Sequence, residues 1–330
     1  MTCPCADGCS RQMQVYVPGV SKVVPPRPLF ARSLPENNVH RGGWCAYNAA
    51  EMRCFTFVVC LLTAGPVLAQ TDISGEWANL LHEDVNHRND AIGGGPRIGD
   101  YTGLPINDAA RLRADSWDAS INTLREHQTI FAPAAYWARG GGGMRISKVV
   151  DDDTQQLIAY KVYRAGAGGS DIRMIWMDGR AHPPEYAAHT WTGFSTGRWD
   201  GAMLTVRTTH VKAGWIQRNG VPASDRATIV EHIVRHGDVL TLVSVVDDPV
   251  YLEEPLVRST NWVQNLTQQL AGVTAESVDE IAGRPDGFVP HHLPGTNRWL
   301  KDAAKEFGIP EEALRGGKKT TYPEWRPKTP

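Results

Sequence analysis

The stretch Thr228–Asp247, TIVEHIVRHGDVLTLVSVVD, decides the fold of this chain. Two runs rich in β-branched residues, Thr228–Arg235 and Val239–Asp247, flank a three-residue turn at His236–Asp238 that contains Gly237. Such runs, separated by three to five residues that include a glycine, are typical of a β-hairpin. The stretch therefore predicts two long antiparallel strands.

The same pattern extends in both directions along the chain. Short strand-like runs alternate with turn residues, such as Asp178-Gly179 after the run Ile172–Met177. The further predicted strands are Met144–Val150, Gln156–Tyr163, Ile172–Met177, Gly197–Trp199, Met203–Val211 and Val257–Val263. Consecutive strands joined by tight turns, without intervening helices, predict an antiparallel meander. We therefore expect a mainly β fold, a lipocalin-like barrel over residues 70–289.

Helical periodicity occurs on either side of these strands. A helix is expected after a first strand near Gly75–Trp77, capped by Asn107 or Asp108, with an apolar face at spacings of four, three, four and three: Ala110, Ala114, Trp117, Ile121 and Leu124. In residues 290–330, Asn297 begins a second apolar face and Gly308 ends it. We expect this segment to be a helical arm packed on the barrel.

The beginning of the chain has the pattern of a secretory signal peptide. Arg53 is followed by the apolar run Cys54–Leu62, and the small residues Val67 and Ala69 precede a cleavage point. We therefore assign residues 52–69 to a signal peptide and expect a secreted or periplasmic protein that begins at Gln70. Residues 1–51 are interpreted as a disordered stretch or one upstream of the true start, with a regulatory or targeting extension as the alternative.

Cleavage changes the chemistry that the chain offers. All six cysteines lie before the cleavage point, which leaves 261 residues with 28 Lys or Arg against 33 Asp or Glu, a net charge of −5. The exported chain would have no disulfide, no thiolate and no cysteine-ligated metal. The sequence after the cleavage point contains no basic stripe and no basic amphipathic helix. We therefore expect neither nucleic-acid binding nor stable membrane insertion. No cofactor motif is present, and the oligomeric state stays open.

Residues Arg125 to Trp262 resemble a family of uncharacterised, mostly bacterial secreted proteins. The matching motifs are DGRAHP at 178–183, GFSTGRWDG at 193–201 and DDP at 247–249, and PHHLPG at 290–295 resembles one branch of that family. The resemblance implies export but no assigned reaction. A weaker resemblance is to lipocalin-like (calycin) barrels, which open on Gly-x-Trp. Here Gly75-Glu76-Trp77 supplies that triplet, and the resemblance implies that Arg258 covers the tryptophan.

Two motifs suggest specific chemistry. His182, Glu185 and His189 offer the imidazole and carboxylate groups that zinc prefers, although their spacing matches no known zinc motif and Pro183-Pro184 exclude a helix there. They support a metal-dependent hydrolase as an alternative. Gly193-Phe194-Ser195-Thr196-Gly197 has the form of a nucleophile elbow, but a strand pair rather than a helix follows it, which favours a structural role.

Further candidates come from strand alternation and loop position. His210 and His232 fall on the apolar faces of their predicted strands, so we expect both to point into the barrel. His127 lies where the first helix is expected to end. The candidate ligand contacts are Trp215, Arg218 and Tyr251.

The leading hypothesis is a small-molecule pocket inside the barrel that performs cofactor-free acid–base chemistry. The candidate catalytic residues are His127, His182, Glu185, His189, His210 and His232. The expected reaction is a lyase, isomerase or hydrolase step on an aromatic, sugar or terpenoid compound. The alternatives are a non-catalytic binding protein with the same pocket and a structural envelope protein.

Overall fold

The structure is a computed structural model that describes residues 71–80, 96–128, 130–137, 139, 142–164, 172–270 and 283–322. The predicted extension 1–51, the signal peptide 52–69 and the expected first residue Gln70 lie outside these ranges. Among the helices of the described ranges, none has both the length and the apolar character to span a membrane.

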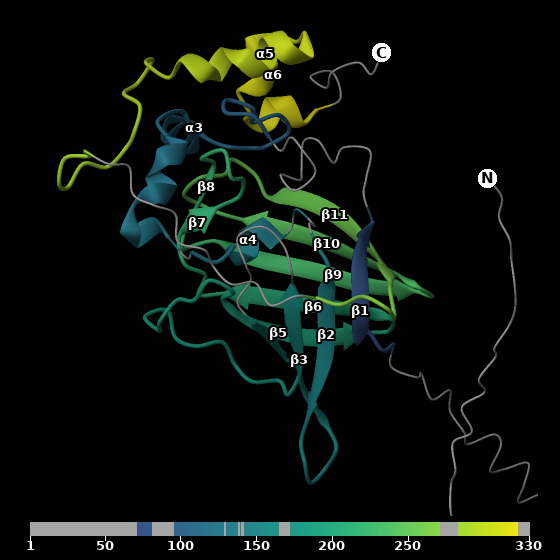
Figure 1. Ribbon diagram of the computed structural model, residues 1–330. Coiled ribbons are helices and arrows are strands. Elements are labelled where there is room, and N and C mark those ends of the chain that lie inside the picture. The colour runs from purple at the N-terminus through teal and green to yellow at the C-terminus, as the bar shows by residue number, and fades with distance from the viewer. Residues whose placement is uncertain are drawn as a thin grey trace, which may run out of the picture. The chain divides into compact units, whose positions relative to one another are not determined.

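A closed barrel forms the centre of the described chain, which confirms the mainly β fold (Figure 1). Nine strands follow the order β1-β11-β10-β9-β6-β5-β4-β3-β2, and β1 pairs with β2 to close the ring. The strands are β1 (Gly75–Leu80), β2 (Met144–Val150), β3 (Leu157–Arg164), β4 (Arg173–Trp176), β5 (Phe194–Asp200), β6 (Met203–Thr209), β9 (Thr228–His236), β10 (Val239–Asp247) and β11 (Leu256–Gln264).

One pair departs from the expected antiparallel meander. β4 and β5 are parallel, with Ile175 opposite Ser195, whereas the other neighbours in the ring are antiparallel. A parallel pair needs a connection that returns the chain to the same end of the barrel. Residues 177–193 make this connection and carry His182, Glu185 and His189. A two-stranded sheet of β7 (Gly214–Trp215) and β8 (Pro222–Ala223) stands apart from the ring.

The helix after the first strand is present but shorter than predicted. α3 (Asp108–Asp115) begins as expected, because the Asn107 side chain accepts a hydrogen bond from the Ala110 amide at 3.0 Å. It ends at Asp115, and the 3-10 helices η2 (Ala119–Thr123) and η3 (Arg125–His127) follow. The Asp118 carboxylate accepts from the Ser120 amide at 2.9 Å, and such side-chain bonds to the backbone compete with helix continuation.

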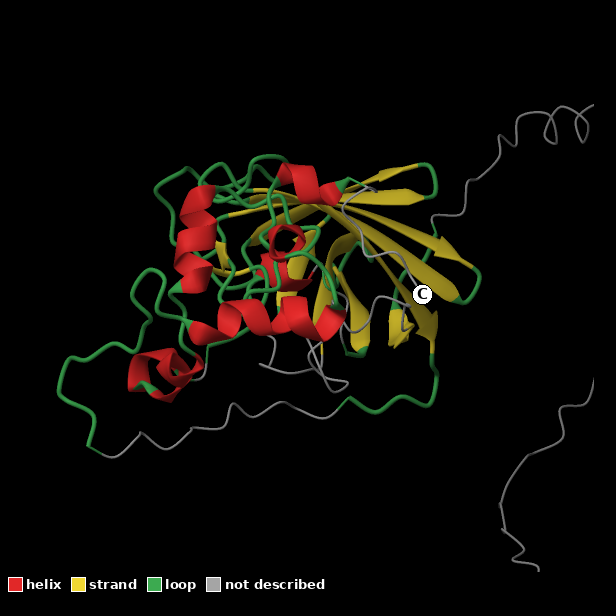
Figure 2. Cartoon of the chain, turned by 90° about the horizontal axis from the view of Figure 1, so that it is seen from above, coloured by secondary structure: helices red, strands yellow, loops and turns green. Residues whose placement is uncertain are grey.

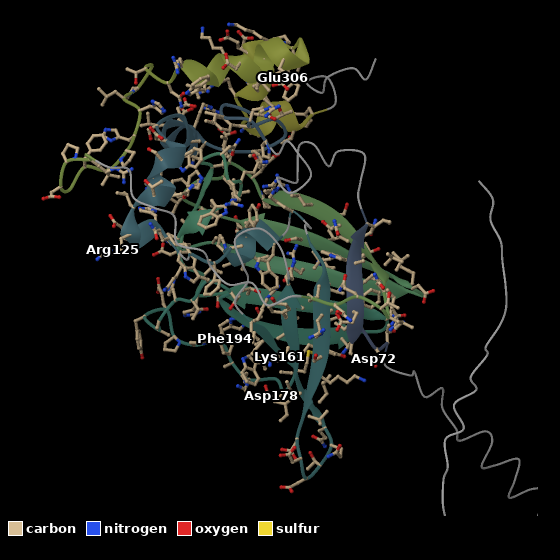
Figure 3. All side chains as sticks on the ribbon, viewed as in Figure 1. Asp72, Arg125, Lys161, Asp178, Phe194 and Glu306 are labelled. Carbon is tan, nitrogen blue, oxygen red and sulfur yellow. The ribbon has the colours of Figure 1, made fainter. Side chains whose placement is uncertain are left out.

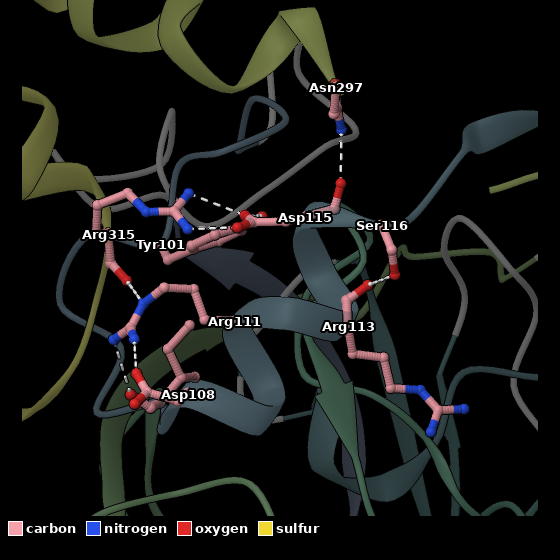
Figure 4. Close-up of polar contacts among 9 residues, drawn as sticks. Tyr101, Asp108, Arg111, Arg113, Asp115, Ser116, Asn297 and Arg315 are labelled. Carbon is pink, nitrogen blue, oxygen red and sulfur yellow. Dashed lines mark hydrogen bonds and ion pairs between the residues drawn. The ribbon is translucent and has the colours of Figure 1, made fainter. Parts of the chain in front are cut away.

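The predicted helical arm is confirmed. It contains η4 (Arg298–Lys301), α5 (Asp302–Phe307), α6 (Glu311–Leu314) and η5 (Lys318–Thr321), and Figure 2 shows these helices in red beside the yellow strands. The arm is fastened to α3. Arg315 forms an ion pair with Asp115, and the Asn297 amide donates to the Asp115 carbonyl at 2.9 Å (Figure 4).

The core is divided into two apolar clusters. One cluster holds Trp77, Leu204, Ile233, Leu242 and Trp262, among others, at one end of the barrel. The other holds the inward residues Ile229, Val246 and Leu256 together with α3 and the loops around β7 and β8. β9, β10 and β11 each contribute to both clusters, so a band of inward positions lies between them.

Candidate functional site

The band between the two apolar clusters is polar, and we call it the polar layer. Its members lie on the inner face of the barrel and are at most 9% exposed. They are Arg164 on β3, Arg173 on β4, Ser195 on β5, Thr208 on β6, Glu231 on β9, Ser244 on β10, and Arg258 and Thr260 on β11. The strand register lines several of them up, because Glu231 lies opposite Ser244 and Ser244 lies opposite Arg258.

An ion pair between Arg173 and Glu231 is the centre of the polar layer. The Arg173 Nη1 atom donates to Glu231 Oε1 at 3.1 Å, and Nη2 donates to Oε2. The same guanidinium donates to Ser195 Oγ at 3.0 Å and to Thr208 Oγ1 at 2.7 Å. Two parallel bonds between a guanidinium and a carboxylate fix both groups in one plane. Glu231 is therefore held as the partner of an arginine.

Arg164 lies between two tryptophans. Its Nη1 atom donates to the Trp137 carbonyl at 2.8 Å, and its Cζ atom lies 5.1 Å from the ring centroid of Trp137 and 5.6 Å from that of Trp262. Removal from water lowers the pKa of Arg164 to about 10, and the nearby Glu231 charge offsets only part of this effect. The interior thus holds a buried guanidinium group between two indole rings.

Trp137 is supplied to this interior by α4 (Ala134–Trp137), a single helical turn. Its indole nitrogen donates to the Ala132 carbonyl at 3.3 Å, and the ring also faces Arg173, whose Cζ atom lies 5.6 Å from the centroid. Trp137 therefore contacts both guanidinium groups and is 5% exposed. Aromatic faces attract cations, so the ring lowers the cost of burying these two charges.

Ser244 adds a further polar atom to the layer. Its hydroxyl oxygen is buried and finds no hydrogen-bond partner among the described residues. Buried polar groups are usually paired, with protein or with ordered water, so such a group calls for an explanation. Ser244 lies opposite Glu231 on one side and Arg258 on the other. This places an available hydroxyl beside charged members of the polar layer.

The sequence-predicted histidines are elsewhere. His182 lies on the outer wall of the barrel, where its Nδ1 atom is 2.7 Å from Thr209 Oγ1 and its Nε2 atom is 2.8 Å from Thr196 Oγ1. Both threonines alternate with the inward residues of their strands and so face outward. Burial lowers the pKa of His182, and the neighbouring Arg207 and His210 lower it further. Figure 3 labels Phe194, whose ring meets the His182 ring edge-on.

His189 and His210 join His182 in this outer group. The ring of His189 lies 5.3 Å from that of His210, and the Nε2 atom of His210 is 2.9 Å from the Pro184 carbonyl oxygen. Glu185 is exposed on the same connection between β4 and β5. The described residues contain no group of three His, Cys, Asp or Glu side chains placed to hold a metal ion. The metal-site pattern in the sequence therefore does not become a ligand cluster in the fold.

The expectation that His210 and His232 point into the barrel is wrong. His210 follows the end of β6 in a left-handed conformation, with φ of 57°, and turns toward the connecting loop. On β9 the fully buried positions are Ile229, Glu231 and Ile233, so His232 faces outward, 3.1 Å from Thr205 Oγ1. His127 lies on η3, half-buried. None of these three joins the polar layer.

The candidate ligand contacts are dispersed. The Trp215 ring lies 6.3 Å from that of Tyr136 and 6.4 Å from that of Trp191. Arg218 lines a cavity beside the helical arm. The Tyr251 hydroxyl accepts from Arg113 Nη1 at 3.0 Å. These three residues do not converge on one site.

Two further predictions are settled by the barrel. Ser195 is fully buried on β5 beside Arg173, so the nucleophile-elbow motif is a strand with a structural serine, as the residues after it favoured. Trp77 is fully buried on β1, but the guanidinium over its ring belongs to Arg235, with Cζ at 5.2 Å, and not to Arg258. Arg258 belongs to the polar layer.

Sequence reasoning missed the polar layer itself. One signal was available, since Glu231 stands between Ile229 and Ile233 at strand spacing, and Arg258 stands between Leu256 and Thr260. A charged residue in the middle of an apolar strand face indicates a buried polar contact. Searches against family models, curated proteins and solved structures returned no match to this chain.

Proposed function

We propose that this protein binds a small organic anion within the barrel, at the polar layer, and that it does so after export through the predicted signal peptide. The single observation that carries the proposal is the composition of the layer. Among the described residues, three guanidinium groups, those of Arg164, Arg173 and Arg258, share the layer with one carboxylate, that of Glu231.

The chemistry of the layer defines the ligand class. Guanidinium groups match the planar geometry of a carboxylate and donate to it through two parallel hydrogen bonds. Trp137 and Trp262 border Arg164, so the apolar part of a ligand would meet aromatic surface. The unpartnered Ser244 hydroxyl offers one more hydrogen bond. A carboxylate attached to an aromatic or other apolar group suits this combination.

Binding has more support than catalysis. Both oxygens of the Glu231 carboxylate accept hydrogen bonds from Arg173, which favours a structural role for this carboxylate. The histidines nominated as catalysts lie on the outer wall or on η3, away from the polar layer. Acid–base chemistry in the barrel therefore stays a prediction of the sequence, and the non-catalytic binding protein is the better-supported alternative.

The test compares anions with their neutral counterparts. Isothermal titration would use benzoate, indole-3-acetate and decanoate, each beside its methyl ester or alcohol. We expect heat from at least one anion, little from its neutral partner, and binding weakened about tenfold or more in Arg258→Met. The matched control is Arg180→Met, because Arg180 pairs with Asp178 at the surface and should leave binding unchanged. Equal binding of anion and ester, or no anion binding at all, would refute the proposal.

A further inference from the structure

A cavity lies between the helical arm and the loops beside α3, with a volume of about 570 Å³. Trp299 and Asp302 of the arm form one side, and Trp117 and Arg218 form part of the other. The volume falls within the range of roughly 300–1,000 Å³ that is typical of small-molecule sites. We call it the arm pocket, and it is separate from the polar layer inside the barrel.

The walls of the arm pocket are fixed by tight contacts between distant parts of the chain. A Cβ atom at Gly99 would lie 2.6 Å from the Leu300 carbonyl oxygen, so only glycine permits the arm to approach this closely. Across the same junction, Arg97 pairs at 3.0 Å with Glu306 on α5. Glu306 is labelled in Figure 3. The Asn219 amide donates to the carbonyls of Arg97 and Asp100, at 2.9 and 2.8 Å. The pocket is thus preformed.

Its aromatic side chains supply flat apolar surface. Trp299 is 43% exposed although it belongs to the pocket lining, and the Cζ atom of Arg298 lies 4.3 Å from its ring centroid, which holds the ring in place. Trp117 contributes a second indole. Ordered, accessible indole rings are costly to leave in water and favour a ligand with a flat apolar face.

Its polar side chains are balanced in charge. Two guanidinium groups, those of Arg97 and Arg218, line the pocket with two carboxylates, those of Asp302 and Glu306. The Asn122 amide adds a group that both donates and accepts hydrogen bonds. Because the positive and negative charges cancel, the lining selects for a neutral ligand with many groups that donate and accept.

We propose that the arm pocket binds a neutral saccharide. A pyranose ring presents a face of C–H groups that stacks on an indole, while its hydroxyls donate to carboxylates and accept from guanidinium groups. The volume of the pocket accommodates one or two sugar rings. This inference is independent of anion binding in the barrel.

Saturation-transfer NMR on the intact protein tests it, with methyl β-D-glucopyranoside, methyl α-D-mannopyranoside, maltose and cellobiose as probes. We expect transfer to the ring protons of at least one probe, with affinity reduced about tenfold or more in Trp299→Ala. Tyr186→Ala is the matched control, because Tyr186 is 91% exposed on the β4–β5 connection. No transfer to any probe would overturn the proposal, and so would equal transfer in Trp299→Ala and the wild type.

Two further experiments make the result specific. Asn122→Ala changes an exposed residue of the lining and should weaken binding without unfolding the arm, so it replaces Trp299→Ala if that variant loses its fold. Glucuronate and glucosamine share the glucose ring but carry a charge, and both should bind more weakly than the neutral glucoside. Stronger binding of either charged sugar would contradict the argument from charge balance. Benzoate should not displace the saccharide.

Discussion

Replacing Glu231 with glutamine removes the charge that pairs with Arg173 inside the barrel while keeping the size of the side chain. The Arg173 and Glu231 side chains are only 4% and 2% exposed, so water cannot take the place of the lost partner. Breaking a buried ion pair from one side costs about 3–5 kcal/mol, because the remaining charge stays buried. We expect Glu231→Gln to lower the free energy of unfolding by this amount.

Urea denaturation followed by tryptophan fluorescence measures the effect. With a slope of about 2–3 kcal/mol per molar urea, the midpoint should fall by roughly 1–2.5 M. The double variant Arg173→Met/Glu231→Leu removes both charges, and we expect it to recover most of the loss. Ser195 and Thr208 bond to each other at 2.9 Å, and this bond does not depend on Arg173 or Glu231. A Glu231→Gln midpoint equal to that of the wild type, or a double variant less stable than the single, would refute this reasoning.

Two other predictions concern His182 and Gly193. Because the pKa of His182 is lowered in the folded protein, the unfolded chain takes up this proton at a higher pH, near 6.5. The free energy of unfolding should therefore fall as the pH drops below that value. Urea titrations from pH 7.5 to 5.5 should show a shallower fall in His182→Asn than in the exposed control His236→Asn. Gly193→Ala should cost about 2–4 kcal/mol in thermal or urea unfolding, because its Cβ would lie 2.6 Å from the Thr209 carbonyl oxygen, whereas Gly237→Ala, with open space around it, should cost about 1 kcal/mol. Equal losses in the two alanine variants would contradict the packing argument.

The two proposed sites differ in how the fold makes them. The polar layer is built by strands that pair directly, so each of its side chains is held by the register of the barrel. The arm pocket is built where separate segments meet, and the Arg97–Glu306 and Arg315–Asp115 pairs close that junction. A variant that releases the arm should therefore abolish saccharide binding and leave anion binding intact.

Local signals in the sequence were enough to predict the strands of the ring, although not the parallel pair or the β7–β8 sheet, and to predict helix caps. The hairpin at Thr228–Asp247 and the left-handed Gly308 appear as predicted, and Asn107 is the one of the two predicted caps that the structure has. Each of these features depends on residues within a few positions of one another. The sequence predicted an end of the first helix that lies beyond the observed end of α3, and a local interaction is again the cause. The apolar spacing continued beyond Asp115, but the short-range bond from the Ser120 amide to the Asp118 carboxylate competes with the helix.

Which side chains meet inside the barrel was decided only by tertiary structure. On β9 the two faces are nearly equivalent in sequence, since Ile229 and Ile233 flank Glu231 while Val230 and Val234 flank His232. Hydrophobic alternation cannot choose between such faces. In the fold Glu231 meets Arg173, 58 residues away, and a buried charge is stabilised by such a partner, which favours the Glu231 carboxylate on the inner face. The sequence by itself was enough to predict a barrel. The contacts between side chains of different strands inside the barrel decided which residues form the polar layer.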